Sequence, residues 1–232
     1  MLADLRLFQL ISPALPVGAF TYSQGLEWAI EAGWVVDADS LADWLDSVMQ
    51  HSVMSLELPI LIRLHRGFSA LHLVNKASEA EATKQMIRDW CQYLIASRES
   101  AELRAEERQR GKALAVLLPS LAIDLPPDIA DAIRQTQLAG MALAAVRWGI
   151  AEEALCRGYL WSWLENSVMA GVKLVPLGQT AGQQLLLKLS EKAPQMVEQA
   201  LSLPDALVGS STPALAIASS RHETQYTRLF RS

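Results

Sequence analysis

Apolar side chains recur at spacings of three and four residues along this chain, and this periodicity constrains the fold more than any other feature of the sequence. Two such sets are Leu41, Trp44, Leu45 and Val48, and Ile87, Trp90, Cys91 and Leu94. Each set lies on one face of an α-helix, which has about 3.6 residues per turn. No Asn-Gly or Asp-Gly dipeptide and no long alternation of β-branched with polar residues suggests strands. The sequence therefore predicts an all-α protein.

The length of the chain fits one domain. Its 232 residues allow one large domain or two small ones, at about 100–200 residues per domain. The predicted connections between helices are short, so we expect a single-domain helical bundle of about eight to ten helices over residues 1–232. Thr212 before Pro213 predicts the start of a last helix. Residues 212–232 are expected to form a C-terminal interaction helix or tail that runs to the end of the chain.

Two further signals predict helix boundaries. Ser40 with Asp43 is a variant capping box, which predicts a helix start at Ser40. Pro59 stands inside a helical pattern and predicts a kink or a break, because proline lacks an N–H group.

The stretch between Arg98 and Lys112 is polar. Arg98 and Glu102 lie four residues apart, as do Glu106 and Arg110. Oppositely charged side chains at this spacing are typical of a solvated helix face. We therefore expect this stretch to be exposed.

Composition excludes several classes of protein. The chain is 51% hydrophobic and only 19% charged, which indicates a large core or an extra apolar surface for a partner. Its net charge of −5 argues against nucleic acid as a partner. Polar residues and prolines interrupt the uncharged run from Leu7 to Leu26, so we expect neither a signal peptide nor a membrane span. The two cysteines, Cys91 and Cys156, fit a reducing cytoplasm.

Catalytic and metal-binding motifs are missing. The Gly111-Lys112 dipeptide has Glu106 where a P-loop needs its first glycine. His65 and His72 are seven residues apart, about 10 Å along a straight helix, which is too far for one metal ion. Glu27 and Glu31 share a helix face and form the one acid/base pair worth considering. We expect no enzyme activity, no stably bound cofactor and no metal site in this chain.

Three segments have compositions that suggest recognition. The segment from Ser12 to Trp28 is uncharged until Glu27 and contains two prolines, and it is either a plug in the core or a recognition surface. Lys173 stands alone in an apolar run, where its stem can also cover the core. On a helix, the last twelve residues would place an aromatic stripe beside a cationic one. The stripes consist of His222, Tyr226 and Leu229, and of Arg221, Gln225 and Arg228. Such a helix docks either on its own core or on a partner.

These segments resemble the urease accessory protein family UreF. The resemblance is carried by S-P-A-L-P-V-G-A-F-T-Y-S-Q-G-L-E-W at 12–28, A-S-R-E-S-A-E-L-R-A-E-E-R at 96–108, Q-L-A-G-M at 137–141, A-G-V-K-L-V-P-L-G-Q at 170–179 and R-H-E-T-Q-Y-T-R-L-F-R-S at 221–232. It spans nearly the whole chain. Thr227, where the family often has serine, and Ser100 are minor departures.

The resemblance implies an all-α, dimeric and non-enzymatic cytoplasmic protein that helps to assemble the dinickel centre of urease. It implies a bridge between an accessory subunit called UreD or UreH and the GTPase UreG, in a complex that docks on apo-urease. Nickel would be handled by the complex and installed at the expense of GTP. The chain itself would act as a scaffold, as a regulator of GTP hydrolysis and as a candidate wall of a nickel passage.

The resemblance also assigns residues to partners. It places the last twelve residues against the UreD-type subunit, with Tyr226, Leu229 and Phe230 buried there and with Arg221 and Arg228 paired to carboxylates or carbonyls. It places Tyr22, Glu27 and Lys173 on the side that faces the GTPase. The complete set of predicted partner-binding residues is Tyr22, Glu27, Lys173, Arg221, His222, Glu223, Gln225, Tyr226, Arg228, Leu229, Phe230 and Arg231.

Two other hypotheses come from different classes of function. One is a generic helical adaptor that is unrelated to urease, suggested by the apolar excess and the aromatic tail. The other is a hydrolase that uses the carboxylates of Glu27 and Glu31.

Overall fold

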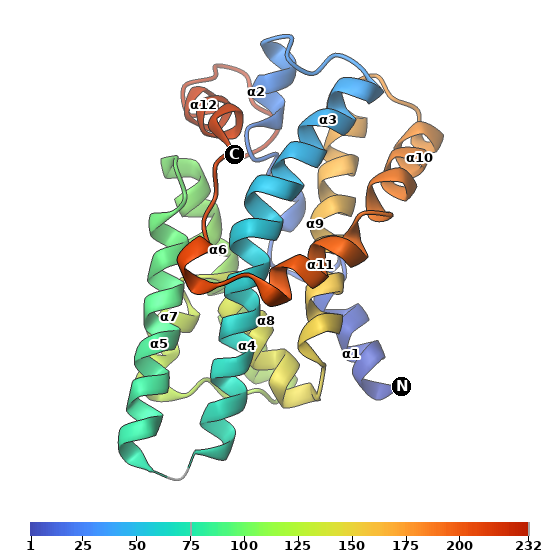
Figure 1. Cartoon of the computed structure of the whole chain (residues 1–232). Helices are drawn as coiled ribbons and strands as arrows, with labels where there is room; N and C mark the ends of the chain where they lie inside the picture. Colours follow the sequence, from blue (N-terminus) through green and yellow to red (C-terminus); the bar gives the residue numbers. More distant parts are fainter. Residues whose placement is uncertain (75, 232) are drawn as a thin grey trace.

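The chain folds into packed helices. The computed structural model describes residues 1–74 and 76–231, and these residues contain no strand (Figure 1). The all-α prediction is therefore confirmed, and ten of the helices have ten or more residues. The helices are α1 (Leu2–Ile11), α2 (Leu26–Glu31), α3 (Ala38–Val48), α4 (Leu58–Leu73), α5 (Ala77–Ala96), α6 (Ala101–Leu117), α7 (Ala130–Ile133), α8 (Gln137–Trp148), α9 (Glu152–Leu174), α10 (Gln179–Ser190), α11 (Ala193–Ser202) and α12 (Pro213–His222).

The core forms around α8. This helix is rich in alanine and glycine, and every residue from Gln137 to Ala145 is buried. Its small side chains let α4 and α6 approach closely. A Cβ atom built on Gly140 would lie 2.7 Å from Leu114 of α6. The two apolar stripes predicted on α3 and α5 face this core, which confirms the periodicity argument. Each described helix is too short or too polar to cross a membrane.

Helices α3 and α4 follow one another along one axis and are joined by the π-helical segment Met49–Glu57 (Figure 1). Pro59 is the second residue of α4, just after the π-helical segment, and the chain stays helical through both junctions. The α-helical geometry is therefore interrupted beside Pro59, but the helix is not broken. Proline cannot donate a hydrogen bond to the carbonyl of Ser55, and that carbonyl instead accepts a hydrogen bond from Gly209 N–H at 3.0 Å. The proline thereby leaves a backbone acceptor for the segment that leads into α12.

The predicted start of α3 is wrong by three residues. Asp37, not Ser40, is the N-cap, and its carboxylate accepts a hydrogen bond from Ser40 N–H at 2.9 Å. Ser40 Oγ accepts the N–H of Asp37 in return, at 3.1 Å. Ser40 is therefore the N3 partner of a capping box that begins at Asp37. The hydroxyl of Ser40 also donates to the Asp37 carboxylate at 2.6 Å, and the two bonds that this carboxylate accepts from Ser40 lower its pKa.

Gly25 fixes the contact between α2 and α12. Its φ is +79°, and a Cβ atom at this position would lie 2.7 Å from the backbone nitrogen of Ser219. We expect Gly25→Ala to lower the free energy of unfolding by about 2–3 kcal/mol, because backbone strain and overpacking add. Gly33 has a φ of +74° and no atom within 4 Å of such a Cβ, so Gly33→Ala measures the strain alone. If urea unfolding shows that both variants lose the same free energy of unfolding, close packing at Gly25 is contradicted.

Candidate protein-binding site

Three segments that are far apart in the sequence meet at one end of the molecule. They are the second half of the segment 12–28, the end of α9 and the C-terminal tail, which we define as residues 223–231 (Figure 1). The first half of that segment lies elsewhere, because Pro16 lines a hollow with Leu117 and Ser120 near the other end of α6. The N–H of Arg231 donates to the carbonyl of Thr21 at 2.7 Å. The Lys173 ammonium lies 5.9 Å from the centre of the Phe230 ring. Ser232, which the sequence analysis includes in this site, lies outside the described residues.

Glu27 holds the backbone of the tail. Its side chain is buried in the first turn of α2, and its two carboxylate oxygens accept hydrogen bonds from consecutive N–H groups. Leu229 N–H donates to Oε1 at 2.7 Å, and Phe230 N–H donates to Oε2 at 2.9 Å. Hydrogen bonds to an ionised acceptor are stronger than those between neutral groups. This carboxylate therefore determines where the end of the tail lies.

His222 links the tail to two helices. It is fully buried at the end of α12. Its Nδ1 lies 2.7 Å from a carboxylate oxygen of Glu102 on α6, and its Nε2 lies 3.3 Å from Oε2 of Glu27 on α2. The imidazole therefore lies between two carboxylates, at the point where the tail leaves the helix.

The remaining tail contacts are also made with carboxylates or with helix ends. Arg228 Nη1 donates to Glu102 at 2.8 Å, and Gln225 donates to Glu31. Glu223 accepts the N–H of Ala101 at 2.7 Å and so satisfies a free donor at the start of α6. The tail is thus bound to both α2 and α6 of its own chain.

The prediction of a helix that runs to the chain end is wrong, because α12 ends at His222. A helix would use the N–H groups of Leu229 and Phe230 internally, whereas both donate to Glu27. The predicted aromatic and cationic stripes do not form. Phe230 is buried against its own chain, while Tyr226 is fully exposed and Leu229 is 68% exposed.

Large apolar side chains are left exposed around the tail. They come from α12, the tail and the segments on either side of α2, which lie together in Figure 1. Arg221 and Arg231 are exposed and form no side-chain ion pair with any residue from 1–74 or 76–231. We call this set the tail-end surface, and its members are Phe20, Trp34, Val36, Ile217, Tyr226, Leu229, Arg221 and Arg231. Exposed aromatic and arginine side chains of this kind are typical of protein interfaces.

The residues that the resemblance assigns to the GTPase side lie at the edge of this surface or beneath it. Tyr22 is half-buried, and its hydroxyl donates to Gln109 at 2.7 Å. Lys173 is exposed, so its amine reaches solvent beside the Phe230 ring. Glu27 is covered by the tail, and both of its oxygens are occupied by tail backbone. Glu27 therefore supports the surface from beneath. Because both of its oxygens accept tail N–H groups, Glu27 offers no free carboxylate for the acid/base pair with Glu31.

A buried ionic network lies behind the site, where an exposed helix face is predicted. Arg98 is buried in the connection between α5 and α6, and it contacts two buried carboxylates. Its guanidinium donates to Glu57 at 2.8 Å and to Glu107 at 2.7 Å. Tyr159 donates to Glu57, and Thr136 donates to Glu107. The prediction that Arg98 lies on an exposed helix face is therefore wrong. Arg98 lies between the two helices, and its guanidinium is buried.

The network sets the charge states of its members. Burial alone would raise the pKa of Glu57, but the Arg98 guanidinium, the Tyr159 hydroxyl and Arg110 together outweigh burial and hold that pKa below its usual value. The carboxylates of Glu57 and Glu107 raise the pKa of Arg98 against its burial. The pKa of Tyr159 is raised well above its usual value, first by burial and then by Glu57. Glu57 and Arg98 are therefore a charged pair inside the protein.

A second part of the network reaches the opening segment. Buried Glu106 accepts hydrogen bonds from Arg110 at 2.8 Å and from Gln24 at 3.1 Å. Gln24 in turn accepts the indole N–H of Trp163 at 3.1 Å, which connects α6, α9 and the start of α2. Burial raises the pKa of Glu106 despite the attraction of Arg110. One sequence signal for this network was available, since Glu57 interrupts the apolar run around residues 53–64.

No cluster of metal-ligating side chains occurs in the part of the chain that the structure describes. Cys91 and Cys156 are buried separately, and burial raises the pKa of each thiol to about 12. Neither thiol is therefore ionised near neutral pH.

Comparisons with known proteins agree with one another. A sequence model of the family described as UreF matches residues 35–190. The urease accessory protein UreF of Alcanivorax borkumensis is 50% identical over 236 residues, which cover 99% of this chain and 98% of the relative. The same protein of a Pseudomonas putida strain is 51% identical, with coverages of 100% and 98%. The Klebsiella pneumoniae protein of this name is 49% identical, with coverages of 98% and 97%.

Proposed function

Because the chain belongs to the UreF family of urease accessory proteins, we propose that it is the scaffold that joins a UreD- or UreH-type subunit to the GTPase UreG during nickel insertion into apo-urease. In this proposal the GTPase carries the phosphate chemistry, and nickel is the cargo of the whole complex. This chain is then a cytoplasmic, non-catalytic member that regulates GTP hydrolysis through contacts.

The tail-end surface is the observation that supports this proposal. It combines exposed apolar side chains with two unpaired arginines, and a buried carboxylate holds its backbone in place. A preorganised surface loses less conformational entropy on binding than a free tail. We propose that Tyr226, Leu229 and Arg231 contact the UreD-type subunit, and that Lys173 and Tyr22 contact the GTPase beside it. Both partners then bind at one end of the chain.

The proposal includes a homodimer. Apolar side chains are also exposed far from the tail, such as Trp161 on α9, Leu187 on α10 and Phe8 on α1. Monomeric proteins seldom expose large contiguous apolar patches. This surplus leaves area for a second copy of the chain without using the tail-end surface.

The proposal is tested by a double variant, Tyr226→Ala with Leu229→Ala. Interface anchors often contribute about 2 kcal/mol each, so we expect capture of the UreD-type subunit to weaken at least about tenfold. The measurement is co-purification with titrated partner, together with urease activation in cells. Both side chains are exposed, so the fold of the free chain is expected to persist.

The matched control is Leu73→Ala with Val116→Ala, two exposed apolar side chains on α4 and α6. We expect this pair to leave capture of the UreD-type subunit unchanged. Full capture and full urease activation by the tail variant would contradict the proposal. Equal weakening by both pairs would show a general loss of apolar surface instead of a specific site.

A further inference from the structure

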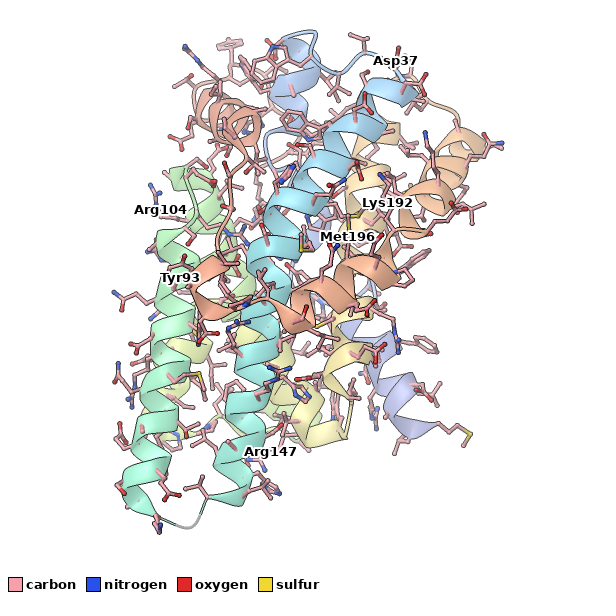
Figure 2. All side chains as sticks on the ribbon, in the orientation of Figure 1. Asp37, Tyr93, Arg104, Arg147, Lys192 and Met196 are labelled. Carbon is pink, nitrogen blue, oxygen red and sulfur yellow. The ribbon has the colours of Figure 1, made fainter. Side chains whose placement is uncertain are left out.

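A second candidate binding site lies far from the tail. It is a pocket of about 230 Å³ formed by α4, α5, α8 and Pro126. Figure 2 shows Arg147, which lines this pocket, near the end of α4 away from α12. We propose that this pocket binds an acidic peptide segment of a partner protein, with one large apolar side chain inserted and carboxylates placed on Arg147 and His72. The inference is independent of the tail-end surface.

The floor of the pocket is apolar. Phe68 and Leu143 are buried, and Leu71 and Val146 are half-buried around them. The volume is below the range of about 300–1,000 Å³ that is typical of sites for drug-sized ligands and cofactors. A cavity of this size and lining fits a single leucine or phenylalanine side chain better than a cofactor or an acyl chain. The apolar part of the ligand is therefore one side chain.

The rim of the pocket is basic and comes from three helices. Lys84 of α5 is paired with Asp128 at 2.6 Å and lies 3.7 Å from Glu81, so its charge is already compensated. Arg147 of α8 and His72 of α4 are exposed, and neither forms a side-chain hydrogen bond or ion pair with another described residue. An arginine with five free N–H donors matches a carboxylate in shape and charge.

The charge of the rim contrasts with the rest of the protein. The chain has a net charge of −5, yet the two unpaired rim groups are an arginine and a histidine beside an apolar cavity. A neutral apolar ligand would leave these donors unused. An anionic ligand without an apolar group would leave the cavity empty. A peptide with an apolar side chain between acidic residues uses both features, which is why we choose this occupant.

The test uses the full chain and a defined probe. We would titrate it with acetyl-Asp-Asp-Phe-Asp-Asp-amide and with the neutral acetyl-Asn-Asn-Phe-Asn-Asn-amide, and follow backbone amide signals by NMR. We expect the acidic peptide to bind with a Kd below about 1 mM and to shift the signals of Phe68, Val146 and Arg147. The neutral peptide is expected to bind at least about tenfold more weakly, and added salt to weaken the acidic one.

Two variants separate the parts of the pocket. Arg147→Gln with His72→Gln removes the donors that would bind carboxylates, and Ala80→Phe fills the cavity while leaving both groups in place. Each is expected to weaken binding of the acidic peptide at least about tenfold. Arg108→Gln is the matched control, because Arg108 is an exposed arginine on α6 away from the pocket. It removes one positive charge, as Arg147→Gln does, and is expected to leave binding unchanged.

Several outcomes would overturn the inference. Absence of shifts at about 1 mM acidic peptide would do so. Equal binding of the two peptides would show that the rim does not select for charge. Equal weakening by Arg108→Gln would show attraction to the whole chain, and tighter binding of laurate would assign the pocket to a lipid.

Discussion

Replacement of Arg98 by methionine is expected to lower the free energy of unfolding by about 3–5 kcal/mol. The guanidinium is buried between the carboxylates of Glu57 and Glu107, both of which are also buried. Its removal leaves those carboxylates in an apolar interior without their cation. Breaking a buried ion pair costs more than the pair contributes, because the remaining charge stays desolvated.

The measurement is urea unfolding followed by circular dichroism, with the slope checked for a two-state transition. The matched control is Arg108→Met, which removes an exposed arginine from α6 and is expected to change stability by less than about 0.5 kcal/mol. Adding Glu57→Gln and Glu107→Gln to the Arg98 variant is expected to restore part of the loss, because the two carboxylates that Arg98 neutralised then carry no charge. A loss no larger than that of the control would show that solvent reaches the network.

The same network predicts an acid dependence that the variant should lack. The pKa of Glu57 is lowered in the folded state, so its ionised form contributes stability above its unfolded pKa. That contribution is lost as the pH falls through the folded pKa. In the Arg98 variant the main cause of the lowered pKa is gone, and the acid-dependent part of the stability is expected to shrink.

Glu27→Ala is expected to release the tail and to speed hydrogen exchange of the Leu229 and Phe230 amides by about 100-fold or more. Both amides donate to the Glu27 carboxylate, and such charge-assisted bonds contribute about 1.5–3 kcal/mol each. A 100-fold change corresponds to about 2.7 kcal/mol, so the loss of two bonds is sufficient. His222 loses one of its two carboxylate neighbours in the same variant.

Two comparisons make this result specific. Glu31→Ala removes a carboxylate one turn further along, which contacts only the Gln225 side chain among the described hydrogen bonds of the tail. It is expected to change exchange of the two amides less than about threefold. Amides of α8 report on the core and should stay protected in both variants. Unchanged exchange at Leu229 and Phe230 would show that the tail is held by other contacts, such as the bond from Arg231 to Thr21.

If the tail is released as expected, the proposed function predicts a further loss. The tail-end surface would then bind the UreD-type subunit from a disordered state, and part of the binding free energy would be used to order it. Partner capture by the Glu27 variant is therefore expected to weaken even though Tyr226 and Leu229 are unchanged.

Local sequence was sufficient to predict the all-α class, several of the helices and the family. Three- and four-residue spacing identified the buried faces of α3 and α5, since a helix places such residues on one side. Pro59 identified the place before α4 where α-helical geometry is interrupted, because the missing N–H is a property of the residue itself. The uncharged opening segment, Lys173 and the last residues suggested a recognition site, and the fold brings Thr21, Glu27 and Lys173 against the tail.

The tertiary structure alone decided how the charged residues are used. Arg98 and Glu102 are four residues apart in the sequence whether Arg98 is exposed or buried. Spacing alone therefore predicted an exposed arginine, whereas Arg98 is paired with Glu57, which lies 41 residues away. The helical pattern of the tail likewise does not indicate that the N–H of Leu229 donates to Glu27, which lies 202 residues earlier in the chain. Periodicity describes what a segment can form by itself, whereas burial of a charge and capture of a backbone donor depend on partners from distant segments. The sequence by itself thus determined the helices and the family, and long-range contacts decided which side chains support the surface and which remain free to bind.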